Sequence, residues 1–297
     1  MLISIIIPFY KGNSYINSTI DSVCQSILYL KKEISDCDCE IIVVNDSPQE
    51  RVNLSDKSFP CQINIIRHDE NKGIHHARIT GLKSSKGKYI LFLDQDDEIA
   101  EKCLLSHINN INDNYVSVSN AFLENKDKSR TLLYKSKRHF EIINKKLAYI
   151  ISHNQIISPG QCLIMKSAIP NQWIETKTII NGSDDLFLWL LMLSKGIKFK
   201  INEDVLYIHK HTGNNLSESE EKMVKSSMEI LDYLQKYNAV TDKESKLFVK
   251  AREFNMLISK GKGSKIKACI KMPNIFLYRL WKRKDRLIKG YGLSKIN

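Results

Sequence analysis

Long hydrophobic runs are missing from this sequence of 297 residues. A transmembrane helix needs roughly 18 or more consecutive apolar residues, and because no such stretch occurs we expect none. The first residues, MLISIIIPFYKG, lack the basic start and the small-residue cleavage site of a signal peptide, so we expect a strand there. The hydrophobic content of 42% is enough for a large core, in one big domain or in a domain with an appendage.

Paired cysteines are also missing. Seven cysteines are scattered along the chain, and Cys37 and Cys39 are the only two that lie close together. A zinc site of the common kind needs a second such pair, so this one makes a poor site. The odd number and the scattered spacing favour a reducing cytoplasm.

Positive charge is concentrated at one end. Residues 260–297 contain twelve Lys or Arg against one acid, Asp285, and so supply +11 of the net charge of +12. The rest of the chain is therefore nearly neutral. A high pI suggests a nucleic-acid partner, but such a protein is expected to interleave its cations with stacking aromatics or groove-reading elements.

Buried strands alternate with helices in the first part of the chain. Continuous apolar runs end in Pro, Asp or His, and helical periodicity with helix-ending signals lies between them. This alternation predicts a mainly parallel sheet with helices on both faces, whose ligands bind at the carboxyl ends of the strands. The expected strands are 2–8, 39–46, 62–68 and 88–94, and the expected helices are 14–32, 72–87 and 98–111.

Carboxylates follow two of these strands. Asp46 closes the second strand, and Asp94, Asp96 and Asp97 close the fourth, so all four should share one edge of the sheet. Like charges at that spacing repel unless a cation joins them. A divalent cation that in turn holds phosphate oxygens would explain the cluster, because such sites use one or two carboxylates. Capping of a helix N-terminus would explain one or two of these acids.

Three segments at these spacings are similar to a known family. SIIIPFYKG (4–12), EIIVVNDS (40–47) and NKGIHHARITGLKSSKGKYILFLDQDD (71–97) resemble the nucleotide-binding half of the inverting GT-A glycosyltransferases of family 2, of the bacterial O-antigen, capsule or exopolysaccharide type. The resemblance covers about the first hundred residues, with weaker similarity up to residue 217. It implies a GT-A α/β fold, with a Rossmann-like sheet, and a nucleotide-sugar donor.

The resemblance assigns a nucleotide-sugar site and a metal site. Asp46 would contact the uracil or the ribose, Asp94 the ribose or the metal, and Asp96 the metal, which is Mn²⁺ or Mg²⁺ in this family. Ile79 departs from the pattern, since an Asn usually follows the motif's Arg. The residues expected to bind the nucleotide-sugar are Pro8, Tyr10, Asp46, Asn71, Gly73, Arg78, Asp94 and Gln95.

Inverting transfer also needs a base that takes the proton of the acceptor hydroxyl. The stretch NGSDDLFLWLLMLSKG resembles the family's E-D-x-x-L-W-L pattern, which places the base on Asp185 and its acidic neighbour on Asp184. A register shifted by one residue would make Asp184 the base, and helix capping is the structural alternative for both. Leu191 stands where the family has an Arg.

The stretch VLYIHKHTGNNLS resembles the closing strand and loop of the same domain. In the family a His there completes the metal site or contacts the diphosphate, and we expect His211 in that role, with His209 as the alternative. The glycine and asparagines at 213–215 predict a mobile loop that closes over bound donor.

The C-terminal third changes in character. After Pro273, apolar residues form one helical stripe, flanked by Lys282, Arg283, Lys284 and Arg286. A basic amphipathic helix with Trp and Tyr fits an anionic membrane surface, and a surface helix packed on the catalytic domain is the alternative. The apolar residues of the stripe are Phe276, Leu277, Leu280, Trp281, Leu287 and Ile288.

Taken together, the sequence predicts a GT-A catalytic domain over 1–217, with a nucleotide-binding half (1–100) and an acceptor half (101–217), and a helical basic extension over 218–297. The predicted activity is metal-dependent transfer of a hexose or N-acetylhexosamine from a UDP-sugar to a saccharide. The acceptor is expected to be polyprenyl-diphosphate-linked, at the inner face of the cytoplasmic membrane. The alternatives are a nucleotidyltransferase like the sugar-nucleotide pyrophosphorylases and a basic nucleic-acid-binding protein; the first would need a glycine-rich loop after the first strand, where PFYKGNSYI stands.

Overall fold

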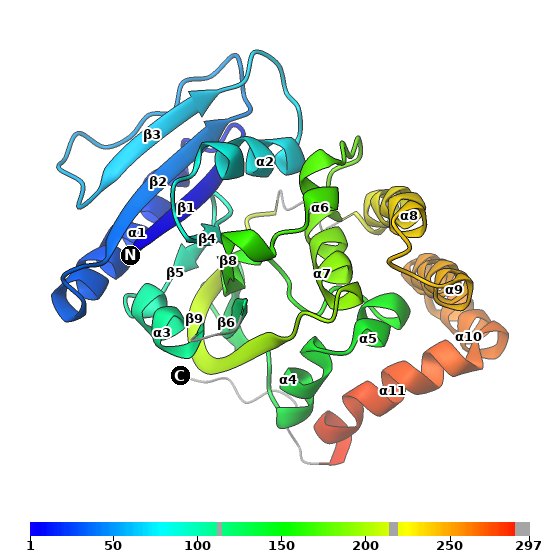
Figure 1. The fold of residues 1–297 in the computed structure, drawn as a ribbon. Coiled ribbons are helices and arrows are strands. Elements are labelled where there is room, and N and C mark those ends of the chain that lie inside the picture. Colours follow the sequence, from blue (N-terminus) through cyan, green and yellow to red (C-terminus); the bar gives the residue numbers. More distant parts are fainter. Residues whose placement is uncertain (112–114, 214–218, 289–297) are drawn as a thin grey trace. The chain divides into compact units, whose positions relative to one another are not determined.

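The computed structural model describes residues 1–111, 115–213 and 219–288 (Figure 1). The chain forms two compact units that alternate along the sequence. The sheet unit consists of Met1–Leu133, Ile156–Lys177 and Lys198–Thr212, and the helical unit consists of Tyr134–Gln155, Thr178–Ile197 and Gly213–Asn297. The division of the chain at residue 217 stays a prediction.

Strands of the sheet unit form one mixed sheet in the order β3-β2-β1-β4-β8-β6-β9-β5, with β7 beside β6. The strands β3, β2, β1 and β4 are parallel, as the alternating pattern predicts. Beyond β4 the pairings are antiparallel, except that β6 and β9 are parallel. The bounds are β1 (Leu2–Phe9), β2 (Asp38–Asn45), β3 (Gln62–Arg67), β4 (Tyr89–Phe92), β5 (Glu98–Ile99), β6 (Val116–Glu124), β7 (Arg130–Leu132), β8 (Cys162–Met165) and β9 (Phe199–Lys210).

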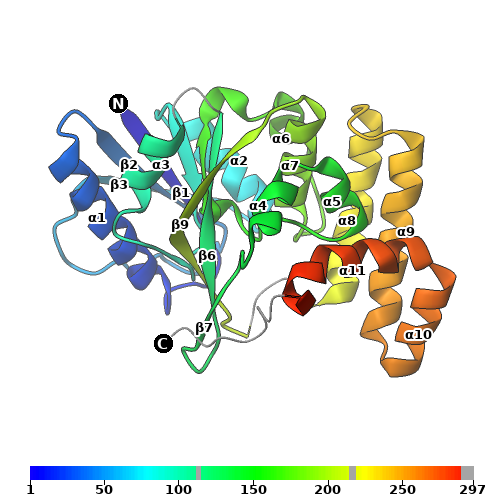
Figure 2. The ribbon, with the colours of Figure 1, turned by 90° about the horizontal axis from the view of Figure 1, so that it is seen from below.

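Helices cover both faces of this sheet (Figures 1 and 2). On one face lie α1 (Ile16–Glu33) and α3 (Cys103–Ile111), and on the other lie α2 (Ile74–Ser84) and the short α6 (Asn171–Glu175). The isoleucines of β1 and the apolar face of α1 are almost fully buried, so the core forms where the periodic apolar residues of strand and helix meet. The α/β class with a GT-A-like sheet is thereby confirmed, although the sheet is mixed rather than mainly parallel.

One predicted helix is shorter than expected. Residues 98–111 do not form a single helix, because Glu98 and Ile99 pair with Ile208 and Tyr207 of β9 and form β5. The helix α3 therefore begins only at Cys103. Short strands of this kind carry too little periodicity to be recognised in a sequence.

The helical unit contains α4 (Lys137–Ile143), α5 (Lys146–Ile151), α7 (Asp184–Ser194), α8 (Glu220–Lys236), α9 (Asp242–Ser259), α10 (Lys262–Lys271) and α11 (Pro273–Ile288). The helix α7 is apolar on nearly all sides, and its residues from Leu186 to Met192 are buried. A capping box at Thr241 and Glu244 begins α9. Among the described residues, no helix is long and apolar enough to cross a membrane.

Candidate active site

The predicted carboxylates do meet at one edge of the sheet. Asp46 directly follows β2 and Asp94 lies just past β4, and β1 pairs with both strands in parallel register. The residues after three neighbouring parallel strands therefore lie side by side, where such sheets bind ligands. In the structure, these acids differ in their burial and in their hydrogen-bond partners, which the sequence motif does not show.

Asp94 is bound to a buried arginine. The Arg78 Nη2 atom lies 2.5 Å from Asp94 Oδ1, and the Ser158 hydroxyl donates to Asp94 Oδ2 at 3.0 Å. Arg78 comes from α2 and is 3% exposed, so this pair links α2 to the end of β4. The Asp94 charge is therefore balanced by the protein itself, which leaves less of it for a metal.

Among the described residues, Asp96 forms no ion pair with a Lys or Arg. Burial, together with the charges of Asp97 and Asp94, raises its pKa to about 7, although the His209 charge acts in the opposite direction. The Thr212 hydroxyl donates to Asp96 Oδ2 at 3.5 Å. A carboxylate held among like charges gains free energy from a bound cation, so the donor chemistry at Asp96 fits Mn²⁺ or Mg²⁺. Across the described residues, no three His, Cys, Asp or Glu side chains converge as a ready-made metal cluster.

Asp97 is the acid that the motif does not assign. It is fully buried, its carboxylate accepts the hydroxyl of Tyr207, and the backbone N–H of Lys210 donates to it at 2.8 Å. The Nδ1 atom of His209 lies 3.1 Å from it. Burial alone would lower the pKa of His209, but the Asp97 charge and hydrogen bond raise it to about 9. Asp97 therefore fixes β9 against the end of β4 and orients the His209 ring.

The two candidate histidines lie together on the end of β9. The rings of His209 and His211 meet edge to face with centroids 5.4 Å apart, and the His211 N–H donates to the Glu124 carbonyl at 2.8 Å. A histidine that binds a metal usually gives its other ring nitrogen to a carboxylate. His209 has that carboxylate in Asp97, so the geometry favours the alternative His209. The assignment of either ring to a metal stays a prediction.

Asp46 is turned into the protein. It is 3% exposed, and its two oxygens accept the backbone N–H groups of Lys72 and Gly73, each at 2.8 Å. His68 Nδ1 lies 2.7 Å from the same carboxylate. Gly73 has φ +88°, a conformation that favours glycine, and directly precedes α2. Here Asp46 anchors the start of α2, and its predicted contact with the nucleotide stays a prediction.

Gln95 joins the loops after β1 and β4. The Tyr10 N–H donates to Gln95 Oε1 at 2.8 Å, and Gln95 Nε2 donates to the Tyr10 carbonyl at 2.9 Å. Pro8 lies within β1, opposite Val44, and the Tyr10 ring is 47% exposed. An exposed aromatic ring on a fixed loop suits stacking against a base. Asn71 is exposed in the loop that precedes Gly73.

The predicted base lies in the helical unit. Asp184 and Asp185 begin α7; Asp184 is 5% exposed, whereas Asp185 is only partly buried. Asn154 Nδ2 donates to Asp185 Oδ2 at 2.7 Å, which holds that carboxylate in one orientation. A base has to reach the acceptor hydroxyl, so the greater exposure favours Asp185. The predicted mobile loop at 213–215 falls, from residue 214 on, outside the described residues.

A model of the protein family "Glycosyl transferase family 2" matches residues 4–170 of this chain. The chain belongs to glycosyl transferase family 2. Membership decides between the three functions that the sequence left open, because it makes the chain a transferase enzyme. The stretch matched includes every predicted nucleotide and metal residue except the histidines.

Two relatives in this family illustrate its range. The chain is 32% identical over 103 residues to an uncharacterized glycosyltransferase of Haemophilus influenzae, covering 34% of this chain and 32% of that protein. It is 28% identical over 213 residues to the poly(ribitol-phosphate) β-N-acetylglucosaminyltransferase TarP of Staphylococcus aureus, covering 69% of this chain and 61% of TarP. The chain spans about a third of the length of the first curated relatives that it matches.

The fold resembles that of a solved structure. Residues 1–349 of S. aureus TarS in complex with UDP-GlcNAc superpose with a TM-score of 0.56 at 16% identity, covering 86% of this chain and 72% of TarS 1–349. At that identity the likeness concerns the fold alone.

Proposed function

We propose that this protein is an inverting, metal-dependent glycosyltransferase that moves a hexose or N-acetylhexosamine from a UDP-sugar to a saccharide acceptor. The observation that carries the proposal is the position of Asp96 beside Asp94 and Asp97 at the carboxyl edge of the parallel strands, where burial and the two neighbouring charges raise its pKa to about 7. Among the described residues, Asp94 pairs with Arg78, and Asp97 accepts from Tyr207 and the Lys210 backbone, whereas the one positive charge that acts on Asp96, that of His209, does so without a direct ion pair. Structures of S. aureus TarS, whose fold this chain shares, with UDP-GlcNAc and with UDP support the choice of donor.

In the proposed reaction, each residue has a distinct task. Asp96, with His209 or His211, would hold Mn²⁺ or Mg²⁺, which when bound neutralises the charge of the leaving diphosphate. The exposed Tyr10, fixed by Gln95, would stack on the base, and Arg78 holds Asp94 in place beside the donor. Asp185 would take the proton of the acceptor hydroxyl as that oxygen attacks the anomeric carbon, which inverts the configuration.

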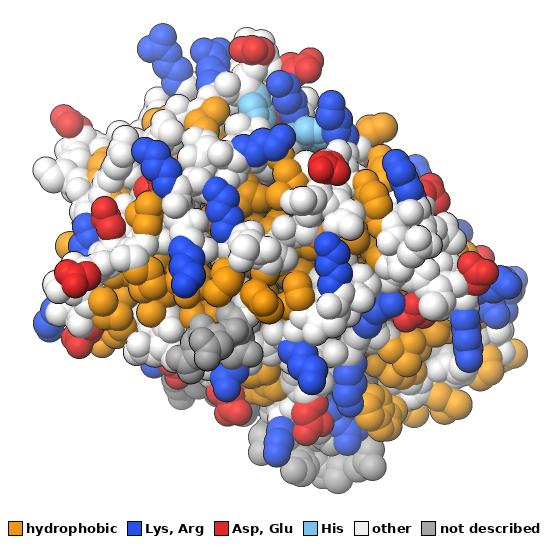
Figure 3. Space-filling view, in the orientation of Figure 1, with side chains coloured by type: hydrophobic (Ala, Val, Ile, Leu, Met, Phe, Trp, Pro, Cys, Tyr) orange, Lys and Arg blue, Asp and Glu red, His pale blue; other side chains and the backbone are white. Residues whose placement is uncertain are grey.

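We infer further that the acceptor is lipid-linked and that α10 and α11 contact an anionic membrane at its cytoplasmic face. Large hydrophobic side chains are exposed on both helices, and Figure 3 shows hydrophobic and Lys or Arg side chains side by side there. Exposed apolar groups among cations suit an anionic lipid surface. The exposed residues are Ile266, Ile270, Phe276, Leu277, Leu280 and Trp281. The residues of the predicted stripe and its basic flank that fall within 282–288 have side chains outside the described part of the structure.

The first test is calorimetric titration of UDP into the protein, with Mn²⁺ and then with EDTA. We expect binding in Mn²⁺ that EDTA removes, because Asp96 would hold the cation and the cation would neutralise the charge of the diphosphate. Binding of GDP or dTDP in place of UDP would keep the transferase and change the donor. If no nucleoside diphosphate binds with Mn²⁺ present, the proposed donor site is wrong.

Membrane contact is tested with the double variant Ile270→Asp/Leu277→Asp. These side chains are 76% and 59% exposed, so the variant should fold, and its binding to phosphatidylglycerol vesicles should fall at least about tenfold. Vesicle co-sedimentation measures the change. The control is Ile179→Asp, which alters an 88% exposed side chain in the same unit away from α10 and α11. Equal binding by all three proteins would rule out this surface.

A further inference from the structure

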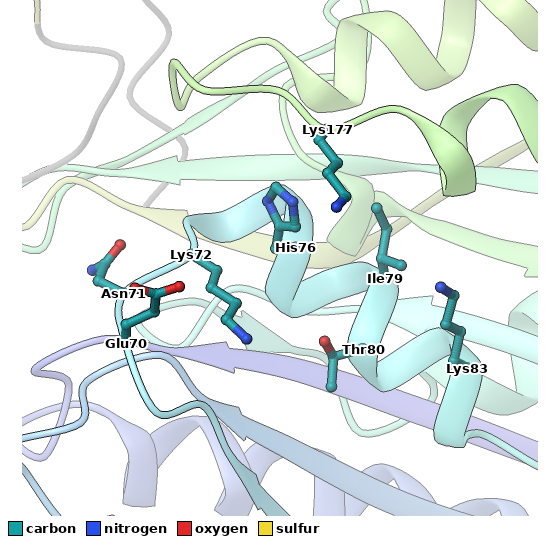
Figure 4. Close-up of a pocket in the computed structure, with 8 residues that line it drawn as sticks. All are labelled: Glu70, Asn71, Lys72, His76, Ile79, Thr80, Lys83 and Lys177. Atoms are coloured by element: carbon teal, nitrogen blue, oxygen red, sulfur yellow. The ribbon is translucent and has the colours of Figure 1, made fainter.

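A groove of about 580 Å³ runs along the outer face of α2 in the sheet unit (Figure 4). Three lysines line it: Lys72 from the loop before α2, Lys83 from α2, and Lys177 from the segment after α6. In Figure 4 they stand on three sides of the groove, with Ile79 and Thr80 between them. Over α2 and α6, Figure 3 likewise shows histidine surface among Lys and Arg side chains.

The described lining of this groove carries more positive than negative charge, because Glu70 is the one acid among the described residues that line it. Within the described part of the chain, Lys72 and Lys83 take part in no ion pair with a carboxylate. Residues 1–259 together are close to neutral, so three lysines around one groove are a local concentration of charge. Such an arrangement costs free energy by repulsion, and a bound anion removes that cost.

The hydrogen-bonding groups of the groove are arranged in a row. His76, Thr80 and Lys83 are spaced four and three residues apart on α2, so they lie on one face of the helix, about 5 Å apart per turn. The Thr80 hydroxyl is fixed by His68 Nε2, at 2.8 Å. Burial lowers the pKa of His76, and the charge of Lys177 adds to this effect. At neutral pH, His76 therefore offers a hydrogen bond rather than a charge.

A row of cations and hydrogen-bonding groups suits a chain molecule with several anionic groups better than one small ion. The volume falls within the range of pockets that hold sizeable ligands, and Ile79 is the one large apolar side chain among the described lining residues. An apolar ligand would find few partners there. A flexible polyol or saccharide chain joined by phosphodiesters matches both the charge and the polarity.

We propose that the groove along α2 binds the phosphodiester groups of an anionic acceptor chain. The loop at one end of the groove is tied to the carboxyl edge of the sheet, because the N–H groups of Lys72 and Gly73 donate to Asp46 there. A chain that lies in the groove would therefore approach the edge that carries the proposed donor site. Its role as acceptor rests on the proposed function, whereas its binding does not.

The test compares Lys83→Glu and Lys177→Glu with Lys200→Glu, an exposed lysine of β9 in the same unit. Each variant changes the net charge equally. We expect a short synthetic glycerol-phosphate oligomer, titrated by calorimetry, to bind about tenfold more weakly to the first two variants and normally to the third. Binding of all forms should weaken with salt. With UDP-sugar as donor, the KM for the oligomer should rise and the KM for UDP-sugar should not.

Three outcomes overturn the assignment. Equal binding of the oligomer by all variants would show that the lysines form no site. An equal loss in Lys200→Glu would show attraction to net charge only. Loss of binding to phosphatidylglycerol vesicles without loss of oligomer binding would assign the groove to a lipid headgroup instead. If UDP fails to bind but the oligomer behaves as expected, the proposed function is wrong and the anion site stands.

Discussion

Replacing Asp96 by Asn should reduce kcat/KM for sugar transfer about a thousandfold and abolish Mn²⁺-dependent binding of UDP. The variant removes the charge that would hold the cation, and losing a metal that neutralises a leaving diphosphate costs several kcal/mol of transition-state stabilisation. Steady-state kinetics and calorimetry measure the two effects. Asp69→Asn, the same change at an exposed carboxylate, is the matched control and should have normal activity.

The same variant should not destabilise the protein without metal. Because the pKa of Asp96 is raised to about 7, its ionised form opposes folding, and that penalty grows from the unfolded value near 4 up to about pH 7. In EDTA at pH 8, Asp96→Asn should therefore unfold at the same temperature or higher, and the gain should shrink at pH 5. If Asp96→Asn unfolds at a lower temperature than the unchanged protein in EDTA, Asp96 stabilises the fold and the proposed role in metal binding is wrong.

Asp97→Asn provides the contrast. This carboxylate is fully buried and accepts from Tyr207 and the Lys210 backbone, so its loss should lower the free energy of unfolding by about 3 kcal/mol. The raised pKa of His209 should then fall, because Asp97 supplies the charge that raises it. Thermal unfolding and NMR titration measure these changes. Two adjacent acids of one motif would thus separate into a binding residue and a structural one.

Much of this fold follows from local patterns. The apolar runs that form β1, β2 and β4 are buried on both faces of a parallel sheet, so they are continuous and easy to recognise. The gathering of Asp46 and Asp94 at one edge follows from strand direction alone. The short β5, and the antiparallel pairing of β8 with β4, depend on partners distant in the sequence, and nothing local predicts them.

The site shows a similar division. The residue types and their edge could be predicted, but the sequence could not tell which acid has a counter-charge, because Arg78, Ser158 and Tyr207 come from distant segments. For the same reason, the burial of Asp46 against the start of α2 could not be foreseen. The helix start at Ile16 gives another example: Asn is a favoured N-cap residue, but Asn13, just before α1, instead binds Glu50 and the backbone of Asn53. Tertiary contacts redirect side chains that local rules assign elsewhere.

Replacing Asp185 by Asn should lower kcat by about 10²- to 10⁴-fold, the usual contribution of a general base, while leaving UDP binding unchanged. Asp185 lies in the first turn of α7, where the helix dipole favours a negative charge, and Asn154 holds Oδ2 at 2.7 Å. Asn154 therefore holds the Asp185 carboxylate in one orientation. Single-turnover transfer and calorimetric titration of UDP separate the two readouts.

Asp184→Asn tests the shifted register. Asp184 is 5% exposed, so it has little access to an acceptor, and its replacement should affect stability more than kcat. If Asp184→Asn loses turnover but unfolds normally, and Asp185→Asn remains active, the base is Asp184 and not Asp185. Asn has the same volume as Asp, but its amide cannot take up the proton of the acceptor hydroxyl. A loss of kcat with unchanged donor binding would therefore show that the variant affects proton transfer and not substrate binding. Because kcat and donor binding can be measured separately, the two variants at the start of α7 are the most direct test of the proposed inverting chemistry.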